Sequence, residues 1–298
     1  MGQSDALRGR TAVVTGAARG LGAALARELA NRGMRVALLG LEAERLEKAA
    51  RPLPVETRCY AVDVTDDEAM RRTAEAVTDD LGAPSVVIAN AGVAEGGPFA
   101  TSDAASWRRV IEVNLIGSAI TARSFLPGLL ASHGYFLQVA STAAFGSAPM
   151  MSAYCASKAG VESFAQSLRA ELAHQRIGVG IAYVHWTDTD MIRDADRHTV
   201  LRELRAHMPP GARKTYPVQR VASWVAQGVD HKSATVYAPP WLRLVQPLRP
   251  LFPYAVTAVS RRALPRLARD SSVEPTGLLG VGGRADWHAL RRHRSEHQ

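Results

Sequence analysis

The sequence predicts an α/β protein with a doubly wound parallel sheet, followed by a C-terminal extension. Through residues 1–240, short runs of apolar and β-branched residues alternate with longer helical patterns. This alternation is typical of parallel strands joined by crossover helices. A glycine-rich turn follows the first run directly, and a helical pattern follows the turn. The chain has 298 residues, 47% of them hydrophobic, which is enough for one large domain of this class.

The first unit is a strand at residues 11–15, a turn and a helix that runs to about Arg32 and stops at Gly33. The turn has the spacing Gly16-x-x-x-Gly20-x-Gly22. A strand, a glycine turn and a helix N-terminus together offer backbone N–H groups to a pyrophosphate. Glycine-rich surface turns without a ligand are equally common. The candidate phosphate-binding residues are Gly16, Arg19, Gly20, Leu21 and Gly22.

The second and third units continue the alternation. We expect a strand at 35–39 and then a helix at 42–50, which prolines 52 and 54 end. Glu42 follows the strand two residues late and can simply begin that helix. A third strand at 55–62 ends in Asp63 and Val64, and a capping box at 65–68 opens a helix that ends near Gly82. Asp63 can accept a hydrogen bond from an adenine amino group or merely shape the turn, and we favour the first.

The next two strands carry polar residues at their carboxyl ends, the edge where ligands bind in open parallel sheets. A strand at 85–89 leads into Asn90, Ala91 and Gly92, and Gly92 lets the chain pass close to a ligand. A long helix at 103–131 contains Asn114, which either faces solvent or organises polar groups. A fifth strand at 135–141 ends in Ser141.

The helix that opens at Ser152 and runs to about Gln175 carries a candidate acid–base pair. Tyr154 and Lys158 are four residues apart and share one helix face. A phenol has a pKa of about 10, but an ammonium ~4 Å away is worth roughly 4 kcal/mol at an effective dielectric of ~20. We therefore expect Lys158 to lower the pKa of Tyr154 toward neutrality. Taken alone the spacing is usually a coincidence, so the other motifs decide its meaning.

The domain closes with a sixth strand at 179–184, helices at about 192–206 and 217–230, and a last strand at 235–238. The loop after the sixth strand reads His185, Trp186, Thr187, Asp188, Thr189. His185 and Trp186 either line a substrate pocket or only pack the loop. Thr187 and Thr189 can offer hydroxyl groups to a ligand.

Composition excludes several classes of function. Two cysteines are too few for a disulfide framework and suit a reducing cytosol, and Cys155 is best explained as a small packed residue. Residues 1–6 lack a secretion or acylation signal, and no apolar run approaches the ~20 residues of a membrane span. Of the net charge of +8, residues 241–298 hold +6, with ten Arg and four acids, so nucleic-acid binding by the domain is disfavoured.

Four motifs in order, joined by Asn114, identify residues 8–240 as similar to the short-chain dehydrogenase/reductase family: Thr15-Gly16-x-x-x-Gly20-x-Gly22, Asn90-Ala91-Gly92, Ser141 and Tyr154-x-x-x-Lys158. The resemblance implies a Rossmann-like domain, NAD or NADP as cofactor, and a homodimer or homotetramer. It also implies roles: Tyr154 transfers the proton, Ser141 orients the substrate oxygen, Lys158 binds the nicotinamide ribose, and Asn114 holds a water in a proton relay.

The sequence departs from the family at two places. The Pro-Gly that usually follows the sixth strand is replaced by Val184 and His185. The acid that favours NAD is absent at Gly40–Leu41, and so is the arginine that often marks NADP. Arg19 is placed to meet a 2′-phosphate, so we favour NADP.

The extension, residues 241–298, mixes apolar residues, prolines and arginines. It can cover the pocket mouth, form an oligomer contact or lie on a membrane surface with arginines at the headgroups. Prolines 247, 250 and 253 argue against one long amphipathic helix, and we expect the chain to fray from Arg284 onward.

The sequence thus predicts a cytoplasmic oxidoreductase that interconverts a secondary alcohol and a ketone, with peripheral membrane contact through the extension left open. We expect it to bind no metal and no nucleic acid. An apolar or lipid-like substrate is suggested by the apolar residues near Ser141: Ala143, Ala144, Phe145, Met150 and Met151. The alternative is a cofactor-binding regulator or scaffold without turnover, which the altered loop and the basic tail support and the intact acid–base residues oppose.

Overall fold

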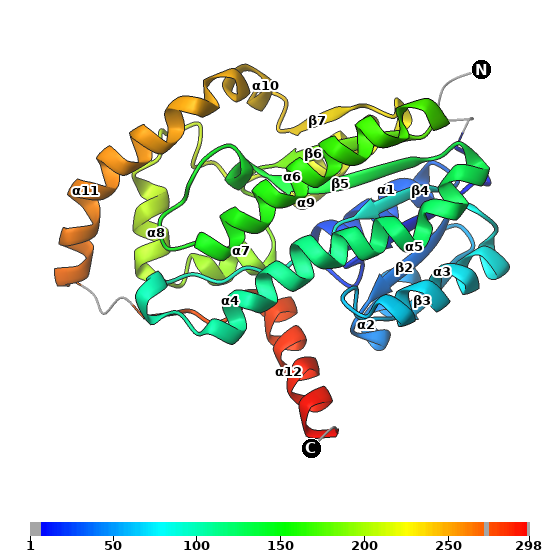
Figure 1. The fold of residues 1–298 in the computed structure, drawn as a ribbon, viewed down its shortest axis with the longest axis horizontal. Coiled ribbons are helices and arrows are strands. Elements are labelled where there is room, and N and C mark those ends of the chain that lie inside the picture. The colour runs from blue at the N-terminus through cyan, green and yellow to red at the C-terminus, as the bar shows by residue number, and fades with distance from the viewer. Residues whose placement is uncertain (1–6, 271–273, 297–298) are drawn as a thin grey trace.

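A computed structural model describes residues 7–270 and 274–296 and has a single seven-stranded parallel sheet at its centre (Figure 1). Residues 1–6, where no targeting signal is expected, lie outside the described residues. The strand order is β3-β2-β1-β4-β5-β6-β7. The strands are β1 Thr11–Thr15, β2 Arg35–Gly40, β3 Thr57–Ala61, β4 Pro84–Ala89, β5 Tyr135–Ser141, β6 Gly178–Val184 and β7 Thr235–Ala238. The predicted doubly wound parallel sheet is confirmed.

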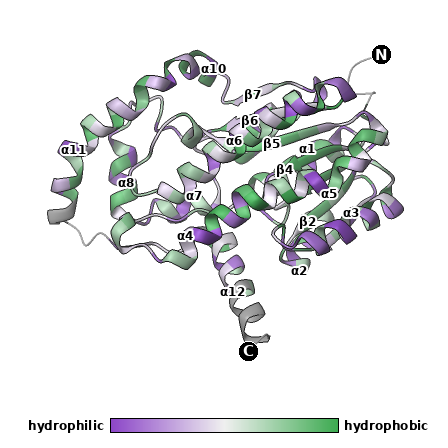
Figure 2. Ribbon diagram, viewed as in Figure 1, coloured by the Kyte–Doolittle hydropathy of each residue, from purple (hydrophilic) through white to green (hydrophobic). Residues whose placement is uncertain are grey.

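Helices cover both faces of the sheet, and each face has its own apolar core. One core is shared with α1 Gly20–Asn31, α2 Ala43–Ala50 and α9 Val218–Asp230. The other is shared with α3 Asp67–Leu81, α4 Ala104–Ile111, α5 Gly117–Ser132 and α6 Ser152–Leu172. The central strands β1 and β4 are buried along their whole length, as a sheet covered on both faces requires. Figure 2 shows the strands at the centre of the sheet, β4 among them, in the colour of hydrophobic residues.

The long helix predicted around Asn114 is interrupted by a π-helical turn, Glu112–Ile116, between α4 and α5. The combined stretch, Ala104–Ser132, has the length and apolar composition of a membrane span. It is nevertheless a core helix, since Phe125 and Leu129 are buried against the sheet.

Two helices differ from the sequence predictions. The cap of α3 is Asp66, whose carboxylate accepts from the N–H of Ala69, one residue later than the capping box predicted. The single helix expected at 192–206 is two helices, α7 Asp190–Ala195 and α8 Thr199–Ala206. The break is a turn in which the N–H of His198 bonds the carbonyl of Ala195, and it frees α7 to pack against the C-terminal helix. Short 3₁₀ turns lie at Phe99–Thr101, Thr142–Ala144 and Ala173–Gln175.

The extension forms three helices and a 3₁₀ segment: α10 Leu242–Val245, the 3₁₀ segment Gln246–Leu251, α11 Phe252–Asp270 and α12 Gly280–Glu296. The prolines do break the extension, as predicted, but α11 still reaches 19 residues. The expected fraying from Arg284 is wrong for the start of this range. Arg284 pairs with Asp194 at 2.8 Å, and Asp286 is buried against the domain. Residues 297–298 lie outside the described part.

Candidate active site

A cavity of about 1250 Å³ lies along the carboxyl ends of the strands and gathers the predicted site residues. Of these residues only Asn114 does not line it. Those that do are Gly16, Arg19, Gly20, Leu21, Gly22, Asp63, Val64, Asn90, Ala91, Gly92, Ser141, Tyr154, Lys158, Thr187 and Thr189. Segments far apart in the sequence therefore meet at the edge of the sheet where the strand-end argument placed them.

The glycine-rich turn is built so that backbone faces the cavity. Gly16 and Gly20 have φ values of 66° and 54°, which favour glycine. A Cβ on Gly22 would lie 2.2 Å from the carbonyl oxygen of Gly16, so no side chain fits there. The first residues of α1 line the same wall. This bare turn at a helix N-terminus fits the pyrophosphate of a dinucleotide.

Asn90 and Thr15 hold the turn against the end of β4. The hydroxyl oxygen of Thr15 accepts from the N–H groups of Asn90 and Ala91, both at 3.0 Å. The amide of Asn90 donates to the carbonyl of Thr15 at 2.9 Å. A Cβ on Gly16 would lie 2.8 Å from the Cα of Ala91. The two motifs thus form one packed unit, and the side chain of Asn90 holds the turn in place.

Ser141, Tyr154 and Lys158 meet at the other side of the cavity, between the end of β5 and the start of α6. The Nζ atom of Lys158 lies 5.7 Å from the centroid of the Tyr154 ring and donates to the carbonyl of Val139 at 3.2 Å. The hydroxyl oxygen of Ser141 accepts from the N–H of Ala143 at 3.1 Å, which fixes its direction. The arrangement places a phenol, a hydroxyl and an ammonium around one space.

Burial dominates the acid–base properties of this group. It raises the pKa of Tyr154 above its ordinary value, and a hydrogen bond with Ser141 opposes the rise. Burial also lowers the pKa of Lys158 to about 8. The expectation that Lys158 lowers the pKa of the phenol is therefore wrong in direction for the protein alone. Desolvation outweighs the attraction, because the ammonium is directed at a carbonyl oxygen rather than at the phenol oxygen.

Asn114 organises polar groups beneath the cavity, which is one of the two alternatives left open by the sequence. Its amide donates to the carbonyl of Val93 and to the hydroxyl of Ser157, both at 2.9 Å. Its side-chain oxygen accepts from the N–H of Val93 at 2.8 Å. The side chain therefore joins the loop after Gly92 to the helix of Lys158. A Cβ on Gly92 would lie 3.2 Å from the side-chain oxygen of Asn114, so the glycine permits this close packing.

The loop after β6 is held by His185 in place of the usual Pro-Gly. The Nδ1 atom of His185 is 3.1 Å from the hydroxyl of Thr142, and Nε2 is 2.6 Å from the carbonyl of Ala212. Since a carbonyl only accepts, Nε2 carries the proton and Nδ1 accepts from Thr142. Burial lowers the pKa of His185 to about 4, so the ring is neutral. His185 both lines the cavity and packs the loop, so the two sequence alternatives coexist.

The two threonines of this loop differ in their surroundings. Thr187 is buried, and its hydroxyl donates to the carbonyl of His185 at 2.8 Å. Thr189 caps α7, and its methyl carbon would lie 3.5 Å from a Cβ on Gly20. Thr189 is thus adjacent to the glycine turn, whereas the hydroxyl of Thr187 is engaged within the loop.

Glu42 is the N-cap residue of α2 and lines the cavity next to the glycine turn. Its carboxylate forms an ion pair with Arg19 and a second one with Arg45 at 3.1 Å. The Nε atom of Arg19 is buried without a hydrogen-bond partner among the described residues. Two guanidinium groups thus contact one carboxylate beside the glycine turn.

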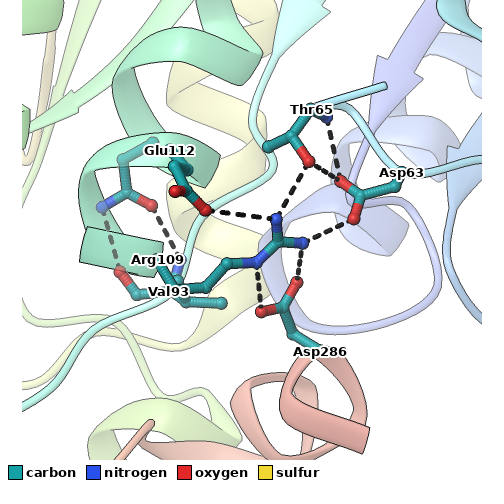
Figure 3. A network of polar contacts seen from close by, with 7 residues as sticks. Asp63, Thr65, Val93, Arg109, Glu112 and Asp286 are labelled. Carbon is teal, nitrogen blue, oxygen red and sulfur yellow. Dashed lines mark hydrogen bonds and ion pairs between the residues drawn. The ribbon is translucent and has the colours of Figure 1, made fainter. Parts of the chain in front are cut away.

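Sequence reasoning missed a buried ion network around Arg109 (Figure 3). The guanidinium binds Asp286 of α12 through two nitrogens, at 2.8 and 2.7 Å, and Asp63 at 2.5 Å. Asp63 also accepts from the N–H of Thr65 at 2.9 Å, so it shapes its turn, and it lines the cavity as well. Burial would raise the pKa of Asp63, but the charge of Arg109 and the bonds from Thr65 hold it below its ordinary value.

The extension contributes walls to the cavity, which agrees with the pocket-covering alternative. Phe252 and Val256 of α11 line one part, and Gly282 of α12 lines another, near Arg19. A Cβ on Gly282 would lie 3.2 Å from a guanidinium nitrogen of Arg19. In the sequence, only the glycines of α12 could have indicated this contact, because a backbone without side chains permits such close approach.

Comparisons with known proteins agree with this geometry. A sequence model of the short chain dehydrogenase family matches residues 10–199. An oxidoreductase of Staphylococcus saprophyticus is 33% identical over 197 residues, covering 64% of this chain and 83% of the relative. A cis-4-hydroxycyclohexanecarboxylate dehydrogenase of Sinomonas cyclohexanicum is 36% identical over 193 residues, covering 63% and 77%.

Two solved structures show the same fold. A metagenomic short-chain oxidoreductase in complex with NADP is 34% identical with a TM-score of 0.57, covering 60% of this chain and 83% of that one. A short chain dehydrogenase/reductase from Burkholderia phymatum in complex with NAD is 26% identical with a TM-score of 0.71, covering 81% and 93%. Proteins similar to this chain thus bind either dinucleotide.

Proposed function

This chain belongs to the short-chain dehydrogenase family, and we propose that it interconverts a secondary alcohol and a ketone with NADP as cofactor. The observation that carries the proposal is the convergence of Ser141, Tyr154 and Lys158 in the same cavity as the bare glycine turn. One cavity can then hold a dinucleotide along the turn and a substrate oxygen beside Tyr154.

The chemistry assigned to the residues follows from their protonation states. With its pKa raised, Tyr154 keeps its proton at neutral pH, as a donor to a carbonyl oxygen must. The hydroxyl of Ser141 donates a hydrogen bond to the same oxygen and orients it. Lys158 stays largely protonated below pH 8 and supplies positive charge as the phenol loses its proton. The nicotinamide, when bound, supplies or accepts the hydride.

The cavity wall supports an apolar substrate. The cavity that holds the acid–base residues is also lined by large apolar side chains: Phe145, Met151, Trp186, Trp241, Leu242, Val245, Phe252 and Val256. We inferred an apolar substrate from five residues near Ser141, and three of them line the cavity: Ala143, Phe145 and Met151. A substrate with a sizeable hydrocarbon part would bury apolar surface here at about 25 cal/mol per Å².

The proposal predicts turnover on apolar substrates. Purified protein with NADP(H) is expected to oxidise or reduce members of a graded panel of secondary alcohols and ketones, with kcat/KM rising as the hydrocarbon part lengthens. The measurement is the absorbance change of the nicotinamide. Tight cofactor binding with no turnover across the panel would instead favour the regulator or scaffold alternative.

The preference for NADP rests on the charges at the edge of the cavity. A 2′-phosphate carries negative charge. The two positive charges of Arg19 and Arg45 exceed the single negative charge of Glu42 by one. An ion-paired carboxylate is also less available to accept from ribose hydroxyls, the contact that selects NAD.

Cofactor choice is tested by fluorescence titration of NADPH and NADH. We expect the wild type to bind NADPH more tightly. Glu42→Gln should increase the ratio of the two affinities about tenfold, because it removes the negative charge beside the 2′-phosphate. Arg45→Gln should decrease the ratio. A wild type that binds NADH tenfold more tightly would overturn the preference.

A further inference from the structure

The segment α10–α11, residues 242–267, forms an arm along one side of the molecule (Figure 1). Five of the seven exposed large hydrophobic side chains in the described part of the chain belong to this arm: Leu244, Leu248, Leu251, Tyr254 and Val259. Leu244 and Tyr254 are 78% and 77% exposed. Such a concentration of exposed apolar side chains on one short segment marks a contact surface for something not present here.

Charge is distributed along the arm in a simple pattern. Residues 250–260 contain no charged residue, and residues 241–269 contain no Asp or Glu. Exposed arginines flank the uncharged stretch: Arg243 precedes it, and Arg261, Arg262 and Arg266 follow it. None of these four makes an ion pair with a described residue. The surface is therefore apolar in the middle and purely basic at its ends.

The opposite face of the arm is built into the enzyme. Phe252, Val256 and Ser260 line the cavity, and Ala263 continues the same helical stripe as a buried residue. Arg249 anchors the arm to α6 through the buried Glu162, with nitrogen–oxygen distances of 2.5 and 3.0 Å. Arg249 also donates to the carbonyl of Ala144, at 3.1 Å. The arm is thus a fixed wall, one helix thick, between the cavity and the exterior.

We propose that the exposed face of this arm docks on an anionic lipid bilayer. Apolar side chains without charged neighbours enter the boundary between headgroups and acyl chains, and arginines at both ends bind anionic headgroups. A second copy of this chain is a poorer occupant, because pairing two arms would bring eight unpaired arginines together without an acid. An acid-free surface is complementary to a layer of negative headgroups.

Docking would also place the cavity wall formed by Phe252 and Val256 against the membrane. An apolar substrate dissolved in the bilayer would then be close to the acid–base residues. This consequence rests on the proposed function, whereas the docking itself does not, so the two can fail separately.

Flotation with liposomes tests the docking on the full-length protein. At low ionic strength we expect the wild type to float with phosphatidylglycerol/phosphatidylcholine vesicles and to bind pure phosphatidylcholine at least tenfold more weakly. Leu251→Glu/Tyr254→Glu should reduce binding at least tenfold by placing charge in the apolar stretch. Arg261→Glu/Arg262→Glu should abolish the preference for anionic vesicles. Phe99→Glu is the matched control, since Phe99 is 71% exposed outside the arm, and it should bind like the wild type.

Each variant is checked for its melting temperature and for NADPH binding, so that unfolding is recognised. The proposal is overturned if the wild type does not float, if it binds neutral vesicles equally well, or if Phe99→Glu loses binding like the arm variants. It is also overturned if sedimentation shows a dimer that Leu251→Glu/Tyr254→Glu dissociates while no vesicle is bound.

Discussion

Replacing Tyr154 by Phe should lower kcat at least 10³-fold and change the affinity for NADPH by less than twofold. The substitution removes the proton that Tyr154 transfers to the substrate oxygen, and general acid catalysis contributes 10²–10⁴-fold to rates. The hydrogen bond with Ser141 is lost as well, while the ring and its packing remain. Steady-state turnover and a fluorescence titration of the cofactor separate the two quantities.

Tyr254→Phe is the matched control, because it removes a phenol hydroxyl from a side chain that is 77% exposed. It should leave kcat unchanged. The pH profile gives an independent check. For reduction, kcat/KM should fall as the pH rises past about 8, where Lys158 loses its proton and its positive charge. If Tyr154→Phe keeps wild-type turnover, the proton comes from another group and the assignment is wrong.

Sequence reasoning predicted the parts of this structure that depend on local sequence patterns. Strand runs, helix periodicity and glycine spacing recur within a few residues, and a parallel sheet brings all carboxyl strand ends to one edge. That rule placed Ser141, the glycine turn and Asn90 at one edge of the sheet, and all of them line the same cavity.

The features that were missed depend on contacts between distant segments. In the local sequence, Arg109 is one charged residue in a helix and Asp286 is one charged residue in the tail. They are 177 residues apart, but in the fold they share two hydrogen bonds. Fraying was expected from Arg284 onward because chain termini are generally poorly ordered. The position of α12 is instead set by long-range contacts such as the N–H of Gly280 to Asp194 at 2.7 Å. The pKa of Tyr154 was missed for the same reason, since burial is a property of the assembled fold.

The largest effect on stability is expected from Arg109, although it touches no proposed reacting group. Arg109→Met should lower the free energy of unfolding at pH 7 by about 3–5 kcal/mol, because it leaves the carboxylates of Asp63 and Asp286 close together without a counter-charge. Chemical unfolding measures the loss. Arg108→Met is the control, since Arg108 is exposed on the same helix and should stay within about 0.5 kcal/mol of the wild type.

The pH dependence of this loss identifies its cause. In the wild type the pKa of Asp63 lies below its ordinary value of about 3.9, so its stabilisation is present above that pH and is lost as the pH falls through the lowered pKa. In Arg109→Met the two carboxylates repel each other, so protonation of a carboxylate raises the free energy of unfolding of the variant rather than lowering it. The difference between variant and wild type should therefore shrink between pH 7 and pH 4. A difference that stays constant over this range would mean that packing, not charge, makes Arg109 important, and that α12 is held in place by its other contacts.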